Sequence, residues 1–501
     1  MRLGHHDRER SRLIRTGAAD REGGYVLVMF AMLLIPLMLL VGLSIDVGSW
    51  YNRASEMQKA ADAAALAGVV WLPDETKARS VAIATAKKNG FDDADPNIDV
   101  DVERSETGPN RLKVTIRDEK VGSFVFSNLG GNDLNMHRDA FAEYLLPVRM
   151  GSPENHLGND PTASGYPTGA PNLWASISGP NTDYGNGDPY STKLGPEYRN
   201  WGYLYIIDVP QAAVGRTLNL DIYDAGFYQR ASYANVETAD YGSVNTQFEL
   251  FQPDDTPANP QDNIDPANNL SMVGRCNGGT PGRFRIAKEA DPAIYKNKWV
   301  TLCRFTPSAP GKWIMQVKSS AIPTIPDGGN GWNQFSVRAR SSGSGDQPAL
   351  YTFGDISLFN NLPGRSGNIN ASFYLAEISQ IHAGKTLEIS LFDPGDGASG
   401  TYYANIRGPG DSVQSCKYRA RGASTWINSS NCRINTRANG KNQYQEKWLD
   451  IRISVPLTYT CTDCWWKVLY EFRNVQSGSS PNDRTVWTAK VIGDPVHLIE
   501  E

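Results

Sequence analysis

The sequence predicts an α+β, multidomain protein with a long N-terminal helix, a small α/β unit and two tandem homologous β-sandwich domains. Three observations lead to this class. An uncharged apolar run near the N-terminus continues directly into a segment with helical spacing. The next stretch alternates between helical and strand patterns. The rest of the 501-residue chain carries short alternating strands and an internal repeat.

The apolar run, Tyr25 to Ile45, predicts a transmembrane helix. Its 21 residues contain no charge, and about 20 are needed to cross a bilayer core. Six arginines precede it in a basic tail, residues 1–24, which places that tail in the cytoplasm and residues after Asp46 outside. A cleaved signal peptide is the alternative. Its apolar region would be about 7–15 residues long, with a small-residue cleavage site after it.

Residues 46–72 predict a stalk helix that continues the apolar one. Small and apolar side chains recur at steps of three and four residues, which is helical spacing. Small side chains let another backbone approach closely, so we expect this face to bind a partner helix. Packing on its own domain is the alternative. The predicted association face comprises Trp50, Ala54, Met57, Ala61, Ala64 and Ala65.

Residues 73–146 predict the small α/β unit. A helix is expected over 74–90, with an acidic start, a basic finish and a closing glycine. Alternating strands are expected at 97–103 and 111–116, a short helix near 121–128, and a last strand over 134–146.

The two β-sandwich domains are predicted from a repeat. "VPQAAVGRTLNLDIYDAG" at 209–226 matches "ISQIHAGKTLEISLFDPG" at 378–395 without a gap, and further matches follow in the same order. We assign the domains to 147–345, including a Gly- and Pro-rich linker to about residue 200, and to 346–501. Tryptophans 299 and 448, and 313 and 465, recur in the repeat and predict core positions.

Cysteine usage indicates an oxidising compartment. All six cysteines follow residue 270, which favours disulfides. Pairing of neighbours is the simplest prediction, although a redox or zinc role for the last two is an alternative. The predicted pairs are Cys276–Cys303, Cys416–Cys432 and Cys461–Cys464.

Composition and motifs favour a protein without enzymatic activity. The net charge of -5 excludes a typical nucleic-acid binder. No HExxH or GxSxG motif occurs. Two carboxylate-rich regions raise the hypothesis of a Ca²⁺ cofactor, against which ordinary Asx-turns are the alternative. Their residues are Asp183, Asn186, Asp188, Asp221 and Asp224, and Asp393 and Asp396.

Residues 22–68 resemble the N-terminal signature of the TadE/TadG-like family of bacterial Flp (Tad) pilus-assembly proteins. The resemblance covers about a tenth of the chain. One departure concerns processing: processed pilins carry Glu five residues after the cleaved glycine, where Met29 stands if Gly24 is that glycine. The shared elements are Gly24, Pro36, Asp46-Val47-Gly48, Gln58 and the run Ala61 to Ala67.

The resemblance implies a single-pass protein of the bacterial inner (cytoplasmic) membrane with its C-terminal region in the cell envelope. It implies a structural, anchoring or adhesive component of a Flp/Tad pilus-assembly or secretion system, with other subunits of that system as partners. Residues 73–146 would then be a pilin-like unit. The alternative is a membrane-tethered, lectin-like surface protein that binds envelope glycans. For that role Trp332 and Trp426, which lie among turn residues, are the candidate exposed rings.

Overall fold

The structure is a computed structural model of the chain. The expected basic tail, through residue 21, and Asp396 lie outside the residues that it describes. It describes residues 22–499 except 73–74, 106–110, 127–133, 145–147, 161, 163–171, 225–240, 243, 255, 257–258, 281, 288–297, 322–327, 344, 362–365, 396, 398–399, 439–440, 479–480 and 493–495.

The chain divides into two compact units that differ from the predicted domains. Unit 1 comprises residues 1–144 together with 496–501, and unit 2 comprises residues 145–495. The sequence placed 346–501 in one sandwich, but its last residues belong to unit 1. The reason is a long-range pairing that no local pattern reveals: Val496 lies opposite Tyr144, and Ile499 opposite Phe141.

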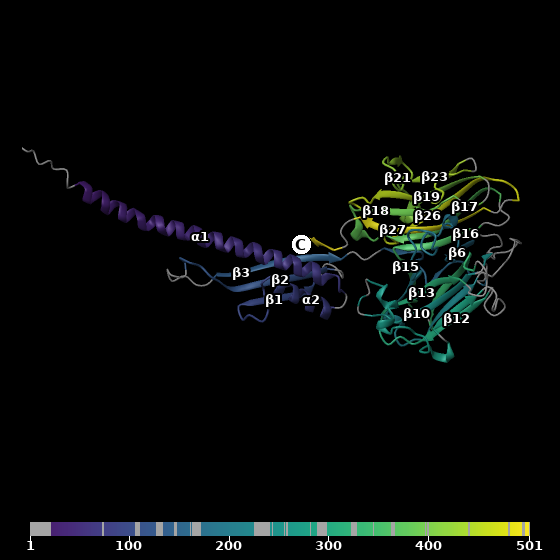
Figure 1. The fold of residues 1–501 in the computed structure, drawn as a ribbon, viewed down its shortest axis with the longest axis horizontal. Helices are drawn as coiled ribbons and strands as arrows, with labels where there is room; N and C mark the ends of the chain where they lie inside the picture. The colour runs from purple at the N-terminus through teal and green to yellow at the C-terminus, as the bar shows by residue number, and fades with distance from the viewer. Residues whose placement is uncertain are drawn as a thin grey trace, which may run out of the picture. The chain divides into compact units, whose positions relative to one another are not determined.

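Unit 1 is a four-stranded antiparallel sheet, as far as the structure describes it, packed on two helices. The strand order is β1-β2-β3-β28, and Figure 1 shows β1, β2 and β3 beside the C-terminal half of the long helix. The elements are α1 (Glu22–Val69), α2 (Glu75–Lys88), β1 (Ile98–Arg104), β2 (Arg111–Val121), β3 (Leu134–Tyr144) and β28 (Val496–Ile499).

Helix α1 confirms the predicted continuous rod. It runs for 48 residues, or about 72 Å at 1.5 Å per residue. Pro36 lies inside it. The short helix predicted near 121–128 is wrong: residues 122–126 form a bend and turn after β2. Backbone amides of this segment are bound by a side chain of α1, which replaces the bonds a helix would make.

Unit 2 is built on two antiparallel sheets. The first runs β11 (Arg283–Ala287), β10 (Val244–Phe251), β13 (Gly311–Ala321), β7 (Tyr203–Val209), β15 (Ala349–Phe353), β4 (Arg149–Met150), β17 (Gly367–Glu377), β26 (Trp465–Val475), β19 (Thr401–Gly408), β23 (Arg433–Ala438) and β24 (Lys441–Asn442), with β20 (Ser412–Val413) beside β19.

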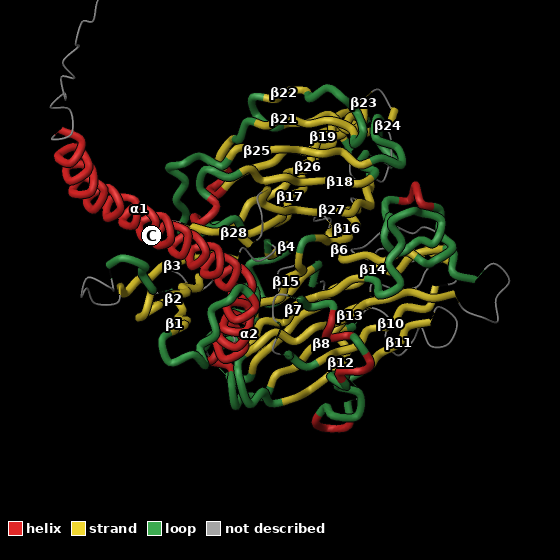
Figure 2. The backbone as a smooth tube through the Cα atoms, turned by 60° about the vertical axis from the view of Figure 1, so that its left-hand side comes forward, coloured by secondary structure: helices red, strands yellow, loops and turns green. Residues whose placement is uncertain are grey.

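The second sheet faces the first across a shared core (Figure 2). Its order is β12 (Trp299–Phe305), β8 (Leu218–Asp224), β14 (Gly331–Ser341), β6 (Asn172–Ser178), β16 (Asp355–Asn361), β27 (Asn482–Ile492), β18 (Thr386–Phe392), β25 (Trp448–Ser454), β21 (Cys416–Ala420) and β22 (Ile427–Ser429), with β5 (His156–Leu157) and β9 (Tyr241–Gly242) beside β14.

The predicted repeat is visible in the strand order. Strands β7, β8, β10, β12, β13 and β14 of the first half correspond in sequence order to β17, β18, β19, β25, β26 and β27 of the second. Along each sheet, the strands of the first half follow one another up to the centre. Beyond the centre, the corresponding strands of the second half follow in the reverse order. Trp299 and Trp448 begin equivalent strands. Trp313, Trp448 and Trp465 are buried, as predicted, and Trp299 is half-buried.

The two halves are joined by hydrogen-bonded strands at the centre of both sheets. In the second sheet β6 pairs with β16. In the first, the halves exchange strands: β15 lies beside β7 of the first half, and β4 beside β17 of the second. The predicted joint at 341–348 therefore leads into a strand of the neighbouring half. The core is correspondingly continuous, since one cluster of buried side chains includes residues of both halves.

Residues 179–200, predicted as part of a linker, are packed against the second half. The Tyr184 ring lies 4.7 Å from that of Phe392, and Glu197 accepts a hydrogen bond of 2.8 Å from the Trp448 indole nitrogen. Asp188, fully buried, accepts backbone N–H groups from its own loop. Turn residues here give a fixed fold because their side chains satisfy the backbone.

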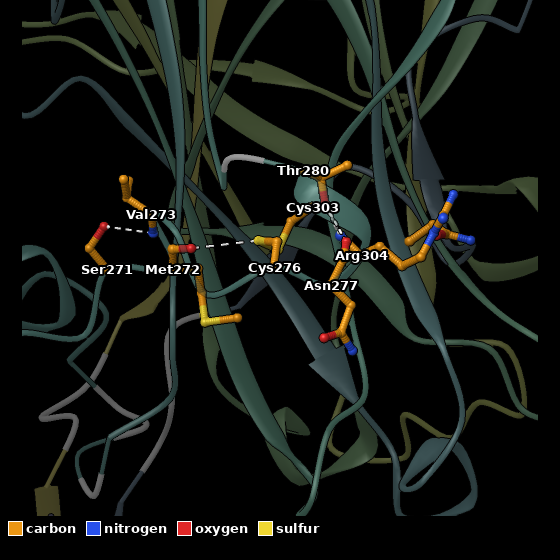
Figure 3. Close-up of a disulfide and its surroundings, with 9 residues drawn as sticks. Ser271, Met272, Val273, Cys276, Asn277, Thr280, Cys303 and Arg304 are labelled. Atoms are coloured by element: carbon orange, nitrogen blue, oxygen red, sulfur yellow. Dashed lines mark hydrogen bonds between the residues drawn. A yellow bond between two sulfur atoms is a disulfide. The ribbon is translucent and has the colours of Figure 1, made fainter.

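All six cysteines are paired as the sequence predicted. Cys276 precedes a short 3₁₀ turn, and Cys303 lies on β12 (Figure 3). Near this bond the Thr280 hydroxyl accepts a 3.0 Å hydrogen bond from the Arg304 backbone N–H. The disulfide therefore fixes the excursion between β10 and β11 to the edge strand β12.

Each half of unit 2 contains a buried glutamate that forms an ion pair with an arginine. Glu249 is 2.6 Å from Arg283, and Glu471 is 2.8 Å from Arg433. Burial raises the pKa of each carboxyl. Hydrogen bonds from the arginine and from Ser271 or Asn405, together with the nearby positive charges, outweigh burial and hold the pKa below its ordinary value of 4.5. Such lowered values stabilise the fold above pH 4.5, and this contribution is lost as pH falls through the folded-state pKa.

We expect the midpoint of thermal unfolding to fall as pH is lowered below about 4.5. Glu471→Gln should lose about 1.5–3 kcal/mol at pH 7 and flatten this dependence, because the charged partner of Arg433 is gone. Exposed Asp346 offers the control, Asp346→Asn. Tryptophan fluorescence during heating measures the effect, and equal pH profiles for both variants would contradict it.

Gly187 is required where residues 179–200 meet the second half. Its φ is +85°, and a Cβ atom there would lie 1.9 Å from the Arg484 carbonyl oxygen. Gly215 has a similar φ of +77° with open space around it. Gly187→Ala should therefore lower the free energy of unfolding by about 1–3 kcal/mol more than Gly215→Ala in urea titrations. Equal losses would show that this contact does not hold the halves together.

Candidate functional site at the exit of the apolar segment

The long helix makes a distinct set of contacts where it leaves the apolar segment. Large apolar side chains from Tyr25 to Val47 are exposed around α1. Along one side, however, Gly42 and Asp46 are buried and Trp50 is half-buried. These three residues, spaced four apart, form the exit stripe. Residues 122–126, which follow β2, cover it and are here called the exit loop.

Asp46 holds the exit loop through its backbone. The carboxylate accepts hydrogen bonds from the N–H groups of Phe124, Val125 and Phe126, the last two at 2.9 Å each. The side chain is only 1% exposed. A buried carboxylate is stable only when hydrogen-bonded, and a loop without secondary structure needs acceptors for its amides. Asp46 meets both requirements at once.

Gly42 and Trp50 complete the contact on either side of Asp46. A Cβ atom at Gly42 would lie 2.2 Å from a methyl carbon of Val125, so only glycine leaves room for this side chain. The Trp50 and Phe126 rings meet edge to face, 6.0 Å apart. The exit loop is thus fixed to α1 over two helical turns.

Below the exit stripe, polar contacts attach α1 to the sheet. Arg53 donates two hydrogen bonds to buried Asp118, at 2.6 and 2.8 Å, and lies 4.4 Å over the Phe91 ring. Gln58 donates to Asp62 and to the Asp139 carbonyl oxygen. The resemblance singled out Gln58 and Asp62: Gln58 connects α1 to β3, and Asp62 accepts a hydrogen bond from Gln58 within α1.

The predicted association face requires a correction. Met57, Ala61, Ala64 and Ala65 are fully buried in the core of unit 1, and Ala54 is 9% exposed. The small side chains admit the unit's own helix α2 and the strands β2 and β3. The close approach was predicted correctly, but its partner is the same chain. This face is therefore not available to another protein in the folded unit.

Sequence patterns missed the exit loop and Gly42. Residues 121–128 were expected to be helical, although Gly122-Ser123 followed by Phe-Val-Phe lacks helical amphipathicity. The available signal was Gly42, which stands exactly one helical step of four residues before Asp46. Without the fold, nothing connects that glycine with Val125, which lies 83 residues further along the chain.

Several of the candidate calcium ligands have partners within the protein. Asp183 accepts from the Gly185 N–H at 3.0 Å, and the Asn186 side chain donates back to the Asp183 carbonyl. Asp188 accepts a 2.7 Å hydrogen bond from the Tyr203 hydroxyl. Asp221 lies 2.6 Å from Arg340 and 3.0 Å from Arg338. Asp183 and Asp188 accept backbone N–H groups two or three residues ahead, as in Asx-turns, whereas Asp221 pairs with arginines of β14.

Asp224 and Asp393 are buried, and Asp393 accepts a 2.8 Å hydrogen bond from the Glu446 N–H. Among the described residues, no group of three or more His, Cys, Asp or Glu side chains is arranged to hold a metal. Calcium binding stays a prediction, testable by comparing thermal unfolding with and without a chelator.

The two candidate tryptophan platforms are both half-buried under cationic side chains. Arg484 lies 4.0 Å over the Trp332 ring. Arg419 and Arg452 lie 4.4 and 4.8 Å over Trp426, beside a polar depression that Arg452 and Lys417 help to line. A sugar ring stacks on an aromatic face, so it would have to displace these guanidinium groups or use the opposite face.

A protein-family model matches the part of the chain that contains the exit stripe. Residues 24–72 match the Tad family of Flp pilus-assembly TadE/G-like proteins. The match confirms the resemblance noted from the sequence and spans the apolar segment, Asp46 and the helix that packs on the sheet. Within the described chain, α1 is also the one helix long and apolar enough to cross a membrane. No curated protein matches the chain.

Solved structures give only distant likenesses. The tandem CBM22-1–CBM22-2 domains of Paenibacillus barcinonensis Xyn10C are 10% identical, with 79% of this chain and 92% of that one covered and a TM-score of 0.14. Paenibacillus xanthan lyase is 10% identical, with 79% and 35% covered and a TM-score of 0.15. The infectious bursal disease virus VP2 particle is 9% identical, with 68% and 84% covered and a TM-score of 0.09. Scores of this size support no functional argument.

Asp46→Ala should release the exit loop, because three backbone N–H groups lose their acceptor. We expect faster hydrogen exchange at residues 124–126 and a loss of about 1–3 kcal/mol in the unfolding of unit 1. Asp62→Ala provides a control on the same helix, since Asp62 accepts only a side-chain hydrogen bond from Gln58 among the contacts described. Unchanged exchange at 124–126 would show that Asp46 does not hold the loop.

Proposed function

We propose that this chain is a membrane-anchored, extracytoplasmic TadG-like component of a bacterial Flp/Tad pilus-assembly or secretion system. The observation that carries the proposal is the coincidence of two independent features. The Tad family match covers residues 24–72, and the same residues form a helix of membrane-spanning length and composition. The proposed role is structural: anchoring, assembly or adhesion, with no enzymatic activity assigned.

Charge and disulfides support the proposed orientation. Residues 2–21 contain six arginines ahead of the apolar segment, which favours a cytoplasmic N-terminus. Unit 2 holds three disulfides, which persist in oxidising compartments such as the bacterial periplasm. We therefore place both units outside the cytoplasmic membrane. Other subunits of the pilus system are the proposed partners.

The packing of the alanine face limits where those partners bind. Because unit 1 buries the alanine face from Met57 to Val69 in its own core, the apolar segment is the stretch of α1 that exposes most of its large apolar side chains. Partner contacts would then use the apolar segment within the membrane or the surfaces of the two units outside it. The lectin-like alternative has weaker support, since guanidinium groups lie over both candidate rings.

Topology can be tested with single cysteines in living cells, because all native cysteines are paired. We expect a membrane-impermeant maleimide to label Lys88→Cys, at the exposed end of α2, once the outer membrane is permeabilised. Ser11→Cys, in the arginine-rich tail, should react only after lysis. The reverse labelling, or recovery of the chain in the soluble fraction, would contradict the anchoring.

The pilus role is tested by deleting the gene in its host. Loss of surface pili, with pilin still produced and with recovery on re-expression of the full chain, would support the proposal. Normal pili in the deletion strain would overturn it, even if the topology were as expected.

A further inference from the structure

The exit loop presents an apolar tip whose exposure is not explained by the fold. Phe124 is 71% exposed and Phe126 is 40% exposed, while the rest of the loop is tied to α1. Two exposed phenylalanines on one short turn are unusual for a surface in contact with water. The same tip is rigidly positioned by Gly42, Asp46 and Trp50, so its exposure is a fixed feature of unit 1.

The level of the loop along α1 identifies what covers it. Val125 contacts the helix at Gly42, one turn before the predicted end of the span at Ile45. The freely exposed part, Tyr25 to Val41, has 17 residues and is about 26 Å long, which is shorter than the roughly 30 Å of a bilayer core. The apolar layer therefore has to extend to Gly42 and beyond. Val41, Leu43, Ile45 and Val47 beside the loop are exposed and apolar.

The polar groups of the loop are arranged for such a setting. Backbone N–H groups in water need no protein acceptor, but at the depth of the hydrocarbon each one must be satisfied within the protein. Asp46 accepts hydrogen bonds from three consecutive N–H groups of the loop. These bonds replace the water that the carboxylate would otherwise bind. The carboxylate and the N–H groups therefore face each other and not the lipid, and the phenyl rings of Phe124 and Phe126 remain on the outer surface.

We infer that the exit loop, Gly122–Phe126, inserts Phe124 and Phe126 into the interfacial layer of the bilayer beside α1. Unit 1 then contacts the membrane at two adjacent points, the helix and the loop, which fixes its height and prevents it from rotating about the helix axis. The ligand is the lipid surface itself, at the boundary between head groups and acyl chains, where amphipathic and aromatic side chains partition. This inference rests on the membrane anchoring of the proposed function.

The test uses the full chain in vesicles of phosphatidylethanolamine and phosphatidylglycerol. Single cysteines carry an environment-sensitive NBD label: Phe124→Cys in the loop, Leu37→Cys in the apolar segment and Lys88→Cys as an exposed control in the same unit. Some lipids carry a nitroxide near the head group, which quenches labels at the interface, and others carry one deep in an acyl chain, which quenches labels within the hydrocarbon core. We expect blue-shifted, quenched emission at positions 124 and 37, and red-shifted, unquenched emission at position 88.

The outcomes separate the inference from the anchoring. If position 37 is quenched while position 124 behaves like position 88, the helix spans the membrane and the inference is wrong. A blue shift at 124 without quenching would place protein, such as a second copy of the chain, over the loop and also overturn it. If position 37 is not quenched, both the anchoring and the inference fail.

A second variant tests the role of Asp46. Adding Asp46→Asn, which keeps the side-chain size, to the labelled Phe124→Cys chain should remove most of the quenching at 124 and leave that at 37 unchanged. Asp62→Asn is the matched control and should change neither. Full quenching at 124 in the Asp46→Asn chain would show that the loop does not depend on this carboxylate for its position.

Discussion

The structure of unit 1 depends on one constraint: a single helix passes from an exposed apolar segment into the core of a domain. Its first half is exposed and apolar, and its second half is buried in a protein core. A helix can change environment along its length because its backbone hydrogen bonds are internal, but the loop that first meets it has no such protection. Where the two environments join, the carboxylate of Asp46 accepts the hydrogen bonds of the loop N–H groups. It allows a strand-to-strand connection to pack on the helix with its backbone satisfied.

The small side chains of α1 follow from the same constraint. At Gly42 the absence of a side chain admits Val125, and further along the alanines admit α2 and the sheet at close range. Alanine also favours the helix by propensity, so the residues that permit close packing also stabilise the rod. Arg53 and Gln58 add polar contacts to β2 and to the Asp139 backbone. The Tad-like signature thus combines an apolar segment of membrane-spanning length with the packing surface of the domain next to it.

Unit 2 solves a different problem, the joining of two repeated halves. Two sandwiches side by side would each leave strand edges exposed, and exposed edges invite pairing with other chains. Here the edges meet: β6 pairs with β16, and the exchanged strands β15 and β4 pair with each other. Residues 179–200 then cover part of the second half, and buried Asp188 fixes their turns. Since the chain leaves unit 1 after Tyr144 and returns at Val496 opposite it, unit 2 is inserted between two neighbouring strands of the unit 1 sheet.

The sequence by itself determined the features that depend on local pattern. It determined the long helix from its apolar run and small-residue spacing, the strands from their alternation, the repeat from matching residues, and the disulfides from neighbouring cysteines. The Tad resemblance was also local, because a membrane helix and its exit are contiguous. Only the tertiary structure decided which surface each element meets. The alanine face packs within its own unit, Gly42 contacts Val125, the predicted joint leads into a strand of the neighbouring half, and the last strand pairs with β3. These outcomes depend on contacts between residues far apart in sequence, whose pairing is set by packing and hydrogen-bond satisfaction over the whole chain rather than by any pattern within a segment.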